Sequence, residues 1–291
     1  MTELHLEIAE RRDLTDRIAE FRLRPAGGQS LPGWAPGAHV RVALPGGGDR
    51  AYSLVSFDPV PEAPEEYRIA VLLEEESTGG SRHMHGLQAG DAVTVTPPKC
   101  DFPLEEGAPA LLLAGGIGIT PVISMAATLK EAGTPFRLHF AARSRAAMAF
   151  AGELQALCGE ALALHFDDEA GGPPDVTALV KGMAPGTHLY ICGPRPMIDA
   201  ARAAAEAAGV APGRVHVELF DNAAAAGGGG DRPFEVEVAS TGQVFTIPPG
   251  KSIIEVLEAG GVDLIYDCRR GDCGICQTGV LEGGPEHRDG V

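Results

Sequence analysis

A run of four alanines and four glycines at residues 223–230 divides this chain of 291 residues into two unequal parts. Side chains this small bury too little apolar surface to build a core, so the run is predicted to be a flexible connector. Two domains of ordinary size fit before it, and one small domain fits after it. The expected organisation is therefore residues 1–104, residues 105–222, the connector 223–230 and residues 231–291.

The segments differ in the pattern of their apolar residues. Over the first hundred residues, short alternating stretches such as HVRVAL at 39–44 are separated by Gly, Pro and Asp, which predicts an antiparallel β-barrel. From there to the connector, strand-like stretches such as ALLLAG at 110–115 alternate with helix-like ones such as PMIDAARAAAEAAG at 196–209. That alternation predicts an α/β domain with a parallel sheet. Beyond the connector, a hairpin over 234–250 and a helix over 252–261 are expected in a partial β-grasp, ferredoxin-like domain.

Charge and hydropathy exclude several classes of function. The formal net charge is −17, and a surface of that sign repels nucleic-acid phosphates. The acidity serves either solubility or docking to a basic protein partner. Residues 107–129 carry no charge, but glycines and a proline interrupt them, which predicts a strand, a turn and a helix start rather than a membrane span. The N-terminus has no signal-peptide pattern and the six cysteines form no disulfide framework, so we expect a cytoplasmic protein.

Three of the cysteines form a cluster-binding pattern. Cys268, Cys273 and Cys276 have the spacing C-x4-C-x2-C, the core of the plant-type [2Fe–2S] motif. Thiolates suit iron and sulfide, and Gly271 and Gly274 allow the backbone to pass closely around a cluster. A zinc loop and a metal-free triplet are the alternatives, although zinc motifs usually carry two CxxC-like pairs. The sequence therefore predicts an iron–sulfur site.

The fourth ligand of that motif does not follow. No cysteine comes after Cys276, and Cys100, Cys158 and Cys192 belong to other expected domains. We therefore expect that the chain stops before its last ligand, as a truncated product or a subunit without its tail. We also expect that it assembles no stable cluster held by four cysteines.

A candidate flavin site lies in the expected barrel. In the segment Arg50-Ala51-Tyr52-Ser53, a cation can hold a flavin phosphate, an aromatic ring can lie on the isoalloxazine, and a hydroxyl can reach N5. About thirty residues later, Gly80 and Ser81 open a helical stretch whose first N–H groups can cradle a phosphate. By itself the first segment fits a surface arginine beside a packed tyrosine better than a flavin site, and the presence of both elements in one barrel is what favours the flavin.

A candidate dinucleotide site lies in the expected α/β domain. Gly115, Gly116 and Gly118 follow an apolar strand and let the backbone approach a pyrophosphate, while Thr120 is placed to cap the next helix. Cys192 ends another strand and can contact nicotinamide. Phe220 can cover the flavin ring, or it is a core residue. We expect Ser53 and Cys192 to be the two catalytic groups.

The order of these motifs resembles the phthalate dioxygenase reductase family, which includes vanillate demethylase reductases. The resemblance spans essentially the whole chain. It implies FMN on the barrel, NAD(H) on the α/β domain, a terminal [2Fe–2S] centre, and electron delivery to a separate Rieske-type oxygenase. Carried over to this sequence, it places at the FMN Arg50, Tyr52, Ser53, Gly80, Ser81 and Phe220, and at the dinucleotide Gly116, Gly118, Thr120 and Cys192.

In the expected reaction, the donor gives two electrons at once and the acceptor takes one at a time. A flavin can connect the two steps, because it can accept a two-electron hydride and release single electrons. NADH is the expected donor. NADPH stays open, because Arg143, Ser144 and Arg145 follow the second α/β strand, where a 2′-phosphate could bind. The alternatives are the electron-transfer subunit of dihydroorotate dehydrogenase, an FAD-containing ferredoxin reductase-like or nitric-oxide-detoxifying enzyme, and a cluster-free module that binds flavin or docks to a partner.

Overall fold

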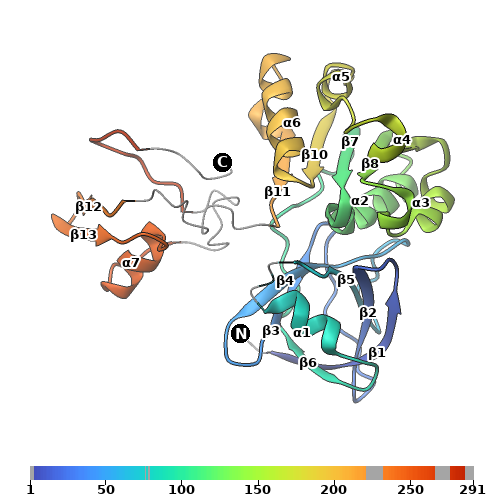
Figure 1. Ribbon diagram of the computed structural model, residues 1–291, viewed down its shortest axis with the longest axis horizontal. Coiled ribbons are helices and arrows are strands. Elements are labelled where there is room, and N and C mark those ends of the chain that lie inside the picture. Colours follow the sequence, from blue (N-terminus) through green and yellow to red (C-terminus); the bar gives the residue numbers. More distant parts are fainter. Residues whose placement is uncertain (1–2, 76, 78, 221–231, 266–275, 286–291) are drawn as a thin grey trace. The chain divides into compact units, whose positions relative to one another are not determined.

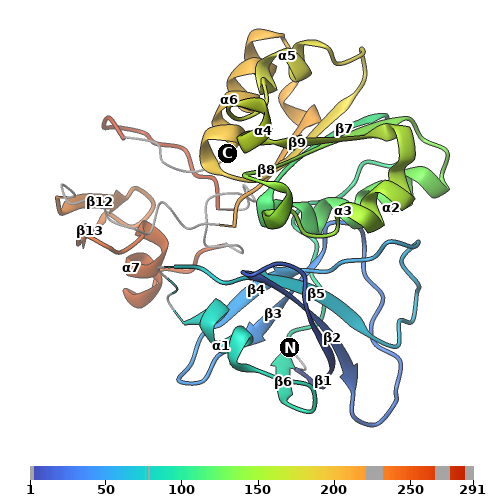
Figure 2. The same ribbon diagram turned by 45° about the vertical axis from the view of Figure 1, so that its right-hand side comes forward.

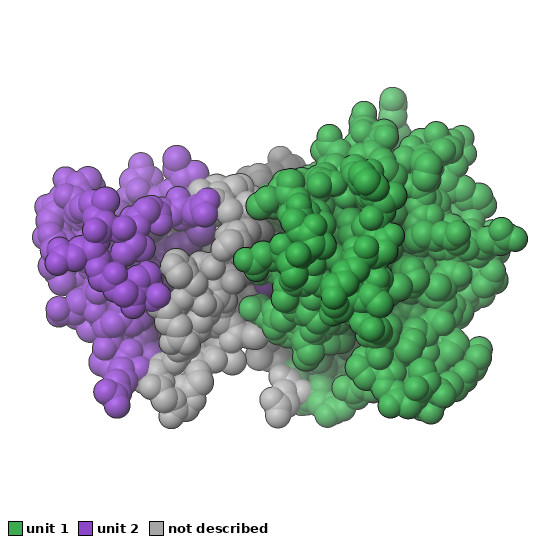
Figure 3. Space-filling view, turned by 90° about the horizontal axis from the view of Figure 1, so that it is seen from above, with its two compact units in different colours: residues 1–218 green, residues 219–291 purple. Residues whose placement is uncertain are grey.

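The computed structural model describes residues 3–75, 77, 79–220, 232–265 and 276–285. The chain forms two compact units, residues 1–218 and 219–291, which Figure 3 shows in different colours. The first unit contains two sheets and the second contains a two-stranded sheet. The expected connector 223–230 lies outside the described residues.

Six antiparallel strands form the N-terminal sheet (Figure 1), in the order β4-β3-β6-β1-β2-β5. Apolar and polar residues alternate along β1, as expected for a strand with one buried face. Leu6 and Ile8 are buried, while Glu7 between them is exposed. An isolated bridge between Leu54 and Ile69 joins the two ends of the sheet into a barrel. The elements are β1 Leu4–Asp13, β2 Ile18–Pro25, β3 His39–Ala43, β4 Asp49–Ser53, β5 Tyr67–Leu72, α1 Gly80–Gly86 and β6 Ala92–Val95.

Five parallel strands form the second sheet, in the order β11-β10-β7-β8-β9. Figure 2 shows α2 and α3 on one face of this sheet and α5 and α6 on the other. Every residue of β7 is buried, as a strand covered on both faces requires. The elements are β7 Ala110–Gly115, α2 Ile119–Glu131, β8 Phe136–Ala142, α3 Ala151–Cys158, β9 Leu162–Phe166, α4 Asp167–Ala170, α5 Val176–Lys181, β10 His188–Cys192, α6 Arg195–Ala207 and β11 Val215–Glu218.

The barrel and the parallel sheet share a hydrophobic core. Val55 and Ala70 of the barrel belong to the same buried cluster as Leu138 of β8. A hydrogen bond also links the barrel to the α/β domain, since Arg12 Nη2 of β1 donates to Glu153 Oε1 of α3 at 2.9 Å. Removal of this shared apolar surface from water holds the two sheets together.

The second unit contains β12 Phe234–Val238, β13 Gln243–Ile247 and α7 Ile253–Ala259. A capping box starts α7, since Ser252 Oγ accepts the Glu255 N–H at 3.2 Å and Glu255 Oε2 accepts the Ser252 N–H at 2.7 Å. The hairpin and helix expected after the connector are therefore confirmed. The expected multidomain fold, with an antiparallel barrel, a parallel-sheet α/β domain and a small third sheet, is confirmed as well.

Among the described residues, no helix is both long enough and apolar enough to cross a membrane. The uncharged stretch 107–129 instead forms β7, a turn and most of α2. The glycines after β7 end the strand there, as the sequence predicted.

Candidate functional site

A glycine turn follows β7, the central strand of the parallel sheet. Gly115 ends the strand, Gly116–Gly118 form one turn of 3₁₀ helix, and α2 begins at Ile119. Gly116 has a φ of 56°, a conformation that side chains other than glycine rarely adopt. The turn therefore lies at the carboxyl end of the sheet, where α/β proteins bind their ligands.

This turn is interlocked with the loop that follows β10. A Cβ atom added to Gly118 would collide with the carbonyl of Cys192, and one added to Gly193 would lie 2.9 Å from the Gly115 nitrogen. The two backbones can approach this closely only because both loops lack side chains at these positions. β7 and β10 are neighbours whose chain connections leave in opposite directions, so the two loops meet at the topological switch point of the sheet.

Two expected site residues lie at this junction in different roles. Cys192 ends β10 and is almost completely buried. Thr120 is also buried, but it lies inside α2 and its hydroxyl donates to the Ile117 carbonyl at 3.0 Å. The expectation that Thr120 caps α2 is wrong, because the helix begins one residue earlier and no side chain bonds to its N-terminus. Gly118 occupies the cap position of α2, and it has no side chain that could bond to the first N–H groups of the helix.

The candidate flavin residues lie on β4. Arg50 packs so closely against α1 that a Cβ atom on Gly80 would collide with its side chain. Ala51 lies on the same strand, half-buried and paired with Arg41. Burial raises the pKa of Tyr52 to about 12, against the opposing effect of Arg50. The phenol therefore stays neutral and offers an uncharged ring face.

Ser53 at the end of β4 has an unusual environment. Its side chain is 4% exposed, and its Oγ has no hydrogen-bond partner among the described residues. An unpaired buried hydroxyl costs about 1–3 kcal/mol. A ligand that supplies a partner would remove that cost, and an acceptor or donor on a flavin edge is of the right kind.

The start of α1 contains a residue that the sequence did not single out. Ser77 Oγ accepts the N–H of Gly79 at 3.2 Å and that of Arg82 at 3.4 Å. Ser81 Oγ donates to Ser77 Oγ at 2.9 Å and accepts the Glu74 N–H at 3.1 Å. Ser81, expected to meet a phosphate, thus also holds the turn in shape. A serine three residues before a helix start is the signal that would have identified Ser77.

The barrel and the glycine turn adjoin each other within the first unit. The Gly37 N–H, in the loop before β3, donates to Ser124 Oγ of α2 at 3.3 Å. The glycine turn also contacts β5 of the barrel. Ser53 pairs with His39 in β3, two residues after Gly37. The flavin candidates and the dinucleotide candidates therefore lie along the same boundary. Ser53, Thr120 and Cys192 are all buried, and none of them lines the pocket beside His139 or the one beside Arg17.

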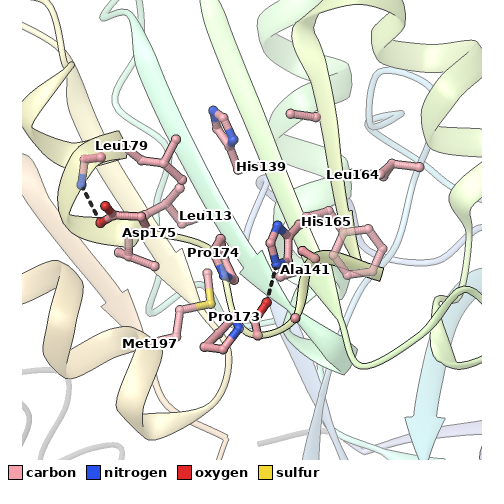
Figure 4. A pocket seen from close by; sticks show the side chains of 17 residues that line it. Leu113, His139, Ala141, Leu164, His165, Pro173, Pro174, Asp175, Leu179 and Met197 are labelled. Carbon is pink, nitrogen blue, oxygen red and sulfur yellow. Dashed lines mark hydrogen bonds between the residues drawn. The ribbon is translucent and has the colours of Figure 1, made fainter. Parts of the chain in front are cut away.

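A pocket of about 470 Å³ lies on the sheet face under the loop between α4 and α5 (Figure 4). His139 and His165 enter it from β8 and β9, and Met197 enters from α6. His165 Nε2 lies 2.8 Å from the Gly172 carbonyl, which ties the loop to the sheet. The pKa of His139 is lowered by burial and by Arg137. The sequence analysis did not identify either histidine as a site residue. Each lies within an ordinary strand pattern, and nothing in those patterns indicates that both side chains line the same pocket.

The residues present fit a flavin and a dinucleotide. A neutral, half-buried tyrosine, an arginine against a glycine at a helix start and an unpaired buried hydroxyl fit an FMN site. The glycine turn at the switch point fits a pyrophosphate. Phe220 is 41% exposed and belongs to the second unit. Cys276 is partly exposed, whereas Cys268 and Cys273 lie outside the described residues.

Two protein-family models match the chain. The model described as an oxidoreductase NAD-binding domain matches residues 112–203, which include the whole glycine turn and Cys192. The model described as a 2Fe-2S iron-sulfur cluster binding domain matches residues 236–290, which include all three cysteines of the C-x4-C-x2-C motif. The expected NAD-binding and [2Fe–2S] domains are confirmed.

Whole-length relatives agree. The chain is 42% identical to the phenoxybenzoate dioxygenase subunit beta of Ectopseudomonas oleovorans, over 94% of this chain and 84% of that protein. It is 40% identical to the vanillate O-demethylase oxidoreductase of Pseudomonas sp. (strain HR199 / DSM 7063), over 97% of this chain and 89% of that protein. Among solved structures it matches phthalate dioxygenase reductase with a TM-score of 0.72 and 34% identity, over 99% of this chain and 90% of that chain.

Proposed function

This chain belongs to the phthalate dioxygenase reductase family, and we propose that it carries electrons from NADH through FMN and a [2Fe–2S] centre to a Rieske-type oxygenase or demethylase. The observation that carries the proposal is the interlock of the glycine turn with the Cys192 loop, directly beside the barrel. It would offer a dinucleotide site next to the barrel, which also contains β4 with Arg50, Tyr52 and Ser53.

The residues of the chain would bind the flavin and the nicotinamide, orient them and shield them from water. Arg50 would neutralise the flavin phosphate, Tyr52 would lie on the ring, and Ser53 would donate its hydrogen bond at the ring edge. Cys192, almost fully buried, would exclude water from the nicotinamide side. A bound flavin would supply the acceptance of a hydride and the release of single electrons.

The iron–sulfur step depends on different residues. Cys268, Cys273 and Cys276 would hold three of the four cluster positions, and thiolates are the donors such clusters prefer. Electron transfer from NADH to the flavin needs none of them. The proposal therefore separates into a hydride step in the first unit and a delivery step that requires the cluster.

The test uses the whole chain reconstituted with FMN or with FAD. With NADH, the FMN form should reduce ferricyanide, a one-electron acceptor, and a Cys276→Ser variant should keep this activity. Reduction of the oxygenase component of a vanillate O-demethylase system should occur only when a fourth cluster ligand is supplied in addition to the cysteines of this chain, and it should then require Cys268, Cys273 and Cys276. Restoration by FAD alone would favour the FAD-containing alternative, and no NADH-dependent reduction with either flavin would contradict the proposal.

We also place the protein in the cytoplasm as part of this proposal. Cys100 and Cys158 form no disulfide among the described residues. Burial raises the pKa of Cys100 and that of Cys158 to about 11, so both thiols stay protonated and poorly reactive at neutral pH. Fractionation of cells that produce the protein checks this location.

A further inference from the structure

An arginine at the carboxyl end of β8 is already bound to a carboxylate. Arg145 donates from Nε to Glu169 Oε1 at 2.5 Å and from Nη2 to Glu169 Oε2 at 3.0 Å. This two-bond fork is the geometry with which arginine also recognises phosphate. The guanidinium lies 4.2 Å from the centroid of the Phe166 ring, which holds it flat against the end of β9.

The carboxylate comes from the neighbouring strand connection. Glu169 lies on α4, which follows β9, and β9 pairs directly with β8. The N–H of Asp168 donates to the Arg143 carbonyl at 3.1 Å, so the two loops are tied together by backbone as well. Asp167, Asp168 and Glu169 are all acidic, and this edge of the sheet is negative despite Arg143 and Arg145.

NADH and NADPH differ at the 2′ position of the adenosine ribose, which is the group that charged residues at this edge of the sheet can distinguish. NADPH carries a 2′-phosphate of nearly two negative charges, whereas NADH carries a neutral 2′-hydroxyl that can donate to a carboxylate. A free arginine at the end of the second strand would favour the phosphate. An arginine whose fork is filled by Glu169 does not, and the carboxylate itself repels the phosphate.

We propose that Glu169, by occupying the fork of Arg145, is the residue that makes this protein select NADH over NADPH. The inference rests on the proposed function, since it requires a dinucleotide along the carboxyl edge of the parallel sheet. The pair is exposed to solvent and therefore screened by salt, so the effect is a moderate preference rather than an absolute barrier.

Binding of nucleotide fragments tests this without any redox step. Dissociation constants for AMP and for 2′,5′-ADP are measured by calorimetry at low salt for the wild type, Glu169→Gln, and Glu169→Gln combined with Arg145→Ala. Removing the carboxylate charge should tighten 2′,5′-ADP by about 10-fold and change AMP by less than about 3-fold. The double variant should lose the gain, because the released arginine provides it. In parallel, kcat/KM for NADPH with ferricyanide should rise by a similar factor in Glu169→Gln.

A matched control is Glu131→Gln, which removes one exposed carboxylate from the end of α2 in the same domain. AMP binding with an unchanged 2′,5′-ADP to AMP ratio in Glu169→Gln overturns the inference and leaves the proposed function standing. An equal gain in Glu131→Gln also overturns it, because the effect would then be one of net charge. Failure of every variant to bind either nucleotide, together with no NADH oxidation, overturns both proposals.

Discussion

Ser53 is the residue that most clearly separates a ligand-binding role from a structural one. A structural serine in the interior uses its hydroxyl to satisfy a neighbour, but Ser53 Oγ has no partner among the described residues. In the ligand-free protein the hydroxyl is therefore an unfavourable group. A serine at the end of β4 is explained if a bound flavin accepts its hydrogen bond.

Replacing Ser53 by alanine should thus have opposite effects on stability and activity. The free energy of unfolding of the flavin-free protein should not fall, since no protein hydrogen bond is lost. The rate of flavin reduction by NADH should fall by about tenfold, the usual effect of one lost hydrogen bond. Urea unfolding and anaerobic rapid mixing measure the two quantities. Ser56→Ala is the control, because that hydroxyl donates to the Asp58 carbonyl at 2.7 Å, and equal loss of rate in both variants would argue against the role.

Gly118 should tolerate no side chain. A Cβ atom there meets the Cys192 carbonyl, which belongs to backbone and cannot move aside cheaply. We expect Gly118→Ala to cost about 1–3 kcal/mol of unfolding free energy and to raise KM for NADH. Gly213→Ala is the matched control, since a Cβ atom there meets no atom within 4 Å. Unchanged stability and KM in Gly118→Ala would mean that the two loops are not interlocked.

Some of these residues could be predicted from the sequence and others could not. Gly115, Gly116 and Gly118 follow an apolar strand, and that local pattern was enough to predict a tight turn there. The sequence did not show why residue 118 must be a glycine. Cys192, whose carbonyl lies against it, is 74 residues away and is brought there only by the parallel pairing of β7 with β10. Thr120 was wrongly expected to cap α2, since the position of the helix start within a glycine turn depends on the packing of the turn.

At the scale of elements, β10 and β11 carry a column of rings on one face of the sheet. Tyr190 and His216 stack at 4.4 Å between centroids, and His188 stacks on His216 at 5.2 Å. His188 Nδ1 lies 3.0 Å from His216 Nε2, so at least one of the two rings must be neutral. Burial, aided by His188 and opposed by Glu105, lowers the pKa of His216.

This column predicts that acid weakens the fold. Because the pKa of His216 is lower in the folded state, the unfolded chain takes up the proton first as the pH drops through about 6.5. The stabilisation is present above that pH and is lost toward the lower folded-state pKa, and His139 acts in the same direction. Urea unfolding at two pH values on either side of this window should give a smaller difference in His216→Gln than in wild type. His5→Gln, which changes an exposed histidine, should keep the full difference, and the same loss in both variants would contradict the prediction.

Elements were easier to predict than the contacts between them. The strand and helix stretches at 110–115 and 196–209 became β7 and α6, because their apolar spacing decides both the local structure and the buried face. The fork between Arg145 and Glu169 could not be predicted, since the two residues follow different strands and are brought together by the pairing of β8 with β9. The same limit applies to His139 and His165 in the pocket.

At the scale of the first unit, the barrel and the α/β domain share one core and should unfold together. Leu138 of β8 is completely buried in that core, and Leu138→Ala should cost about 2–5 kcal/mol. The only tryptophan, Trp34, packs against the barrel core and reports on the barrel alone. Its fluorescence transition should shift with the far-UV circular dichroism transition in Leu138→Ala. A fluorescence midpoint that stays at the wild-type value would show that the barrel unfolds independently.

The sequence predicted three differently built segments, but not that the first two share a core. The apolar patterns of HVRVAL and ALLLAG predict each strand separately, and nothing in the local sequence indicates that Val55 and Leu138 belong to one hydrophobic core. The expectations on Cys268, Cys273 and the connector 223–230 concern residues outside those that the structure describes, and they stay predictions.

The proposed function depends most on direct hydride transfer between NADH and a flavin held at the boundary of barrel and parallel sheet. Rapid anaerobic mixing of the FMN-loaded chain with NADH, and with NADH deuterated at the transferred position, measures this step alone. We predict complete loss of the oxidised-flavin absorbance, slower with the deuterated donor. A flavin that stays oxidised under saturating NADH would contradict the account.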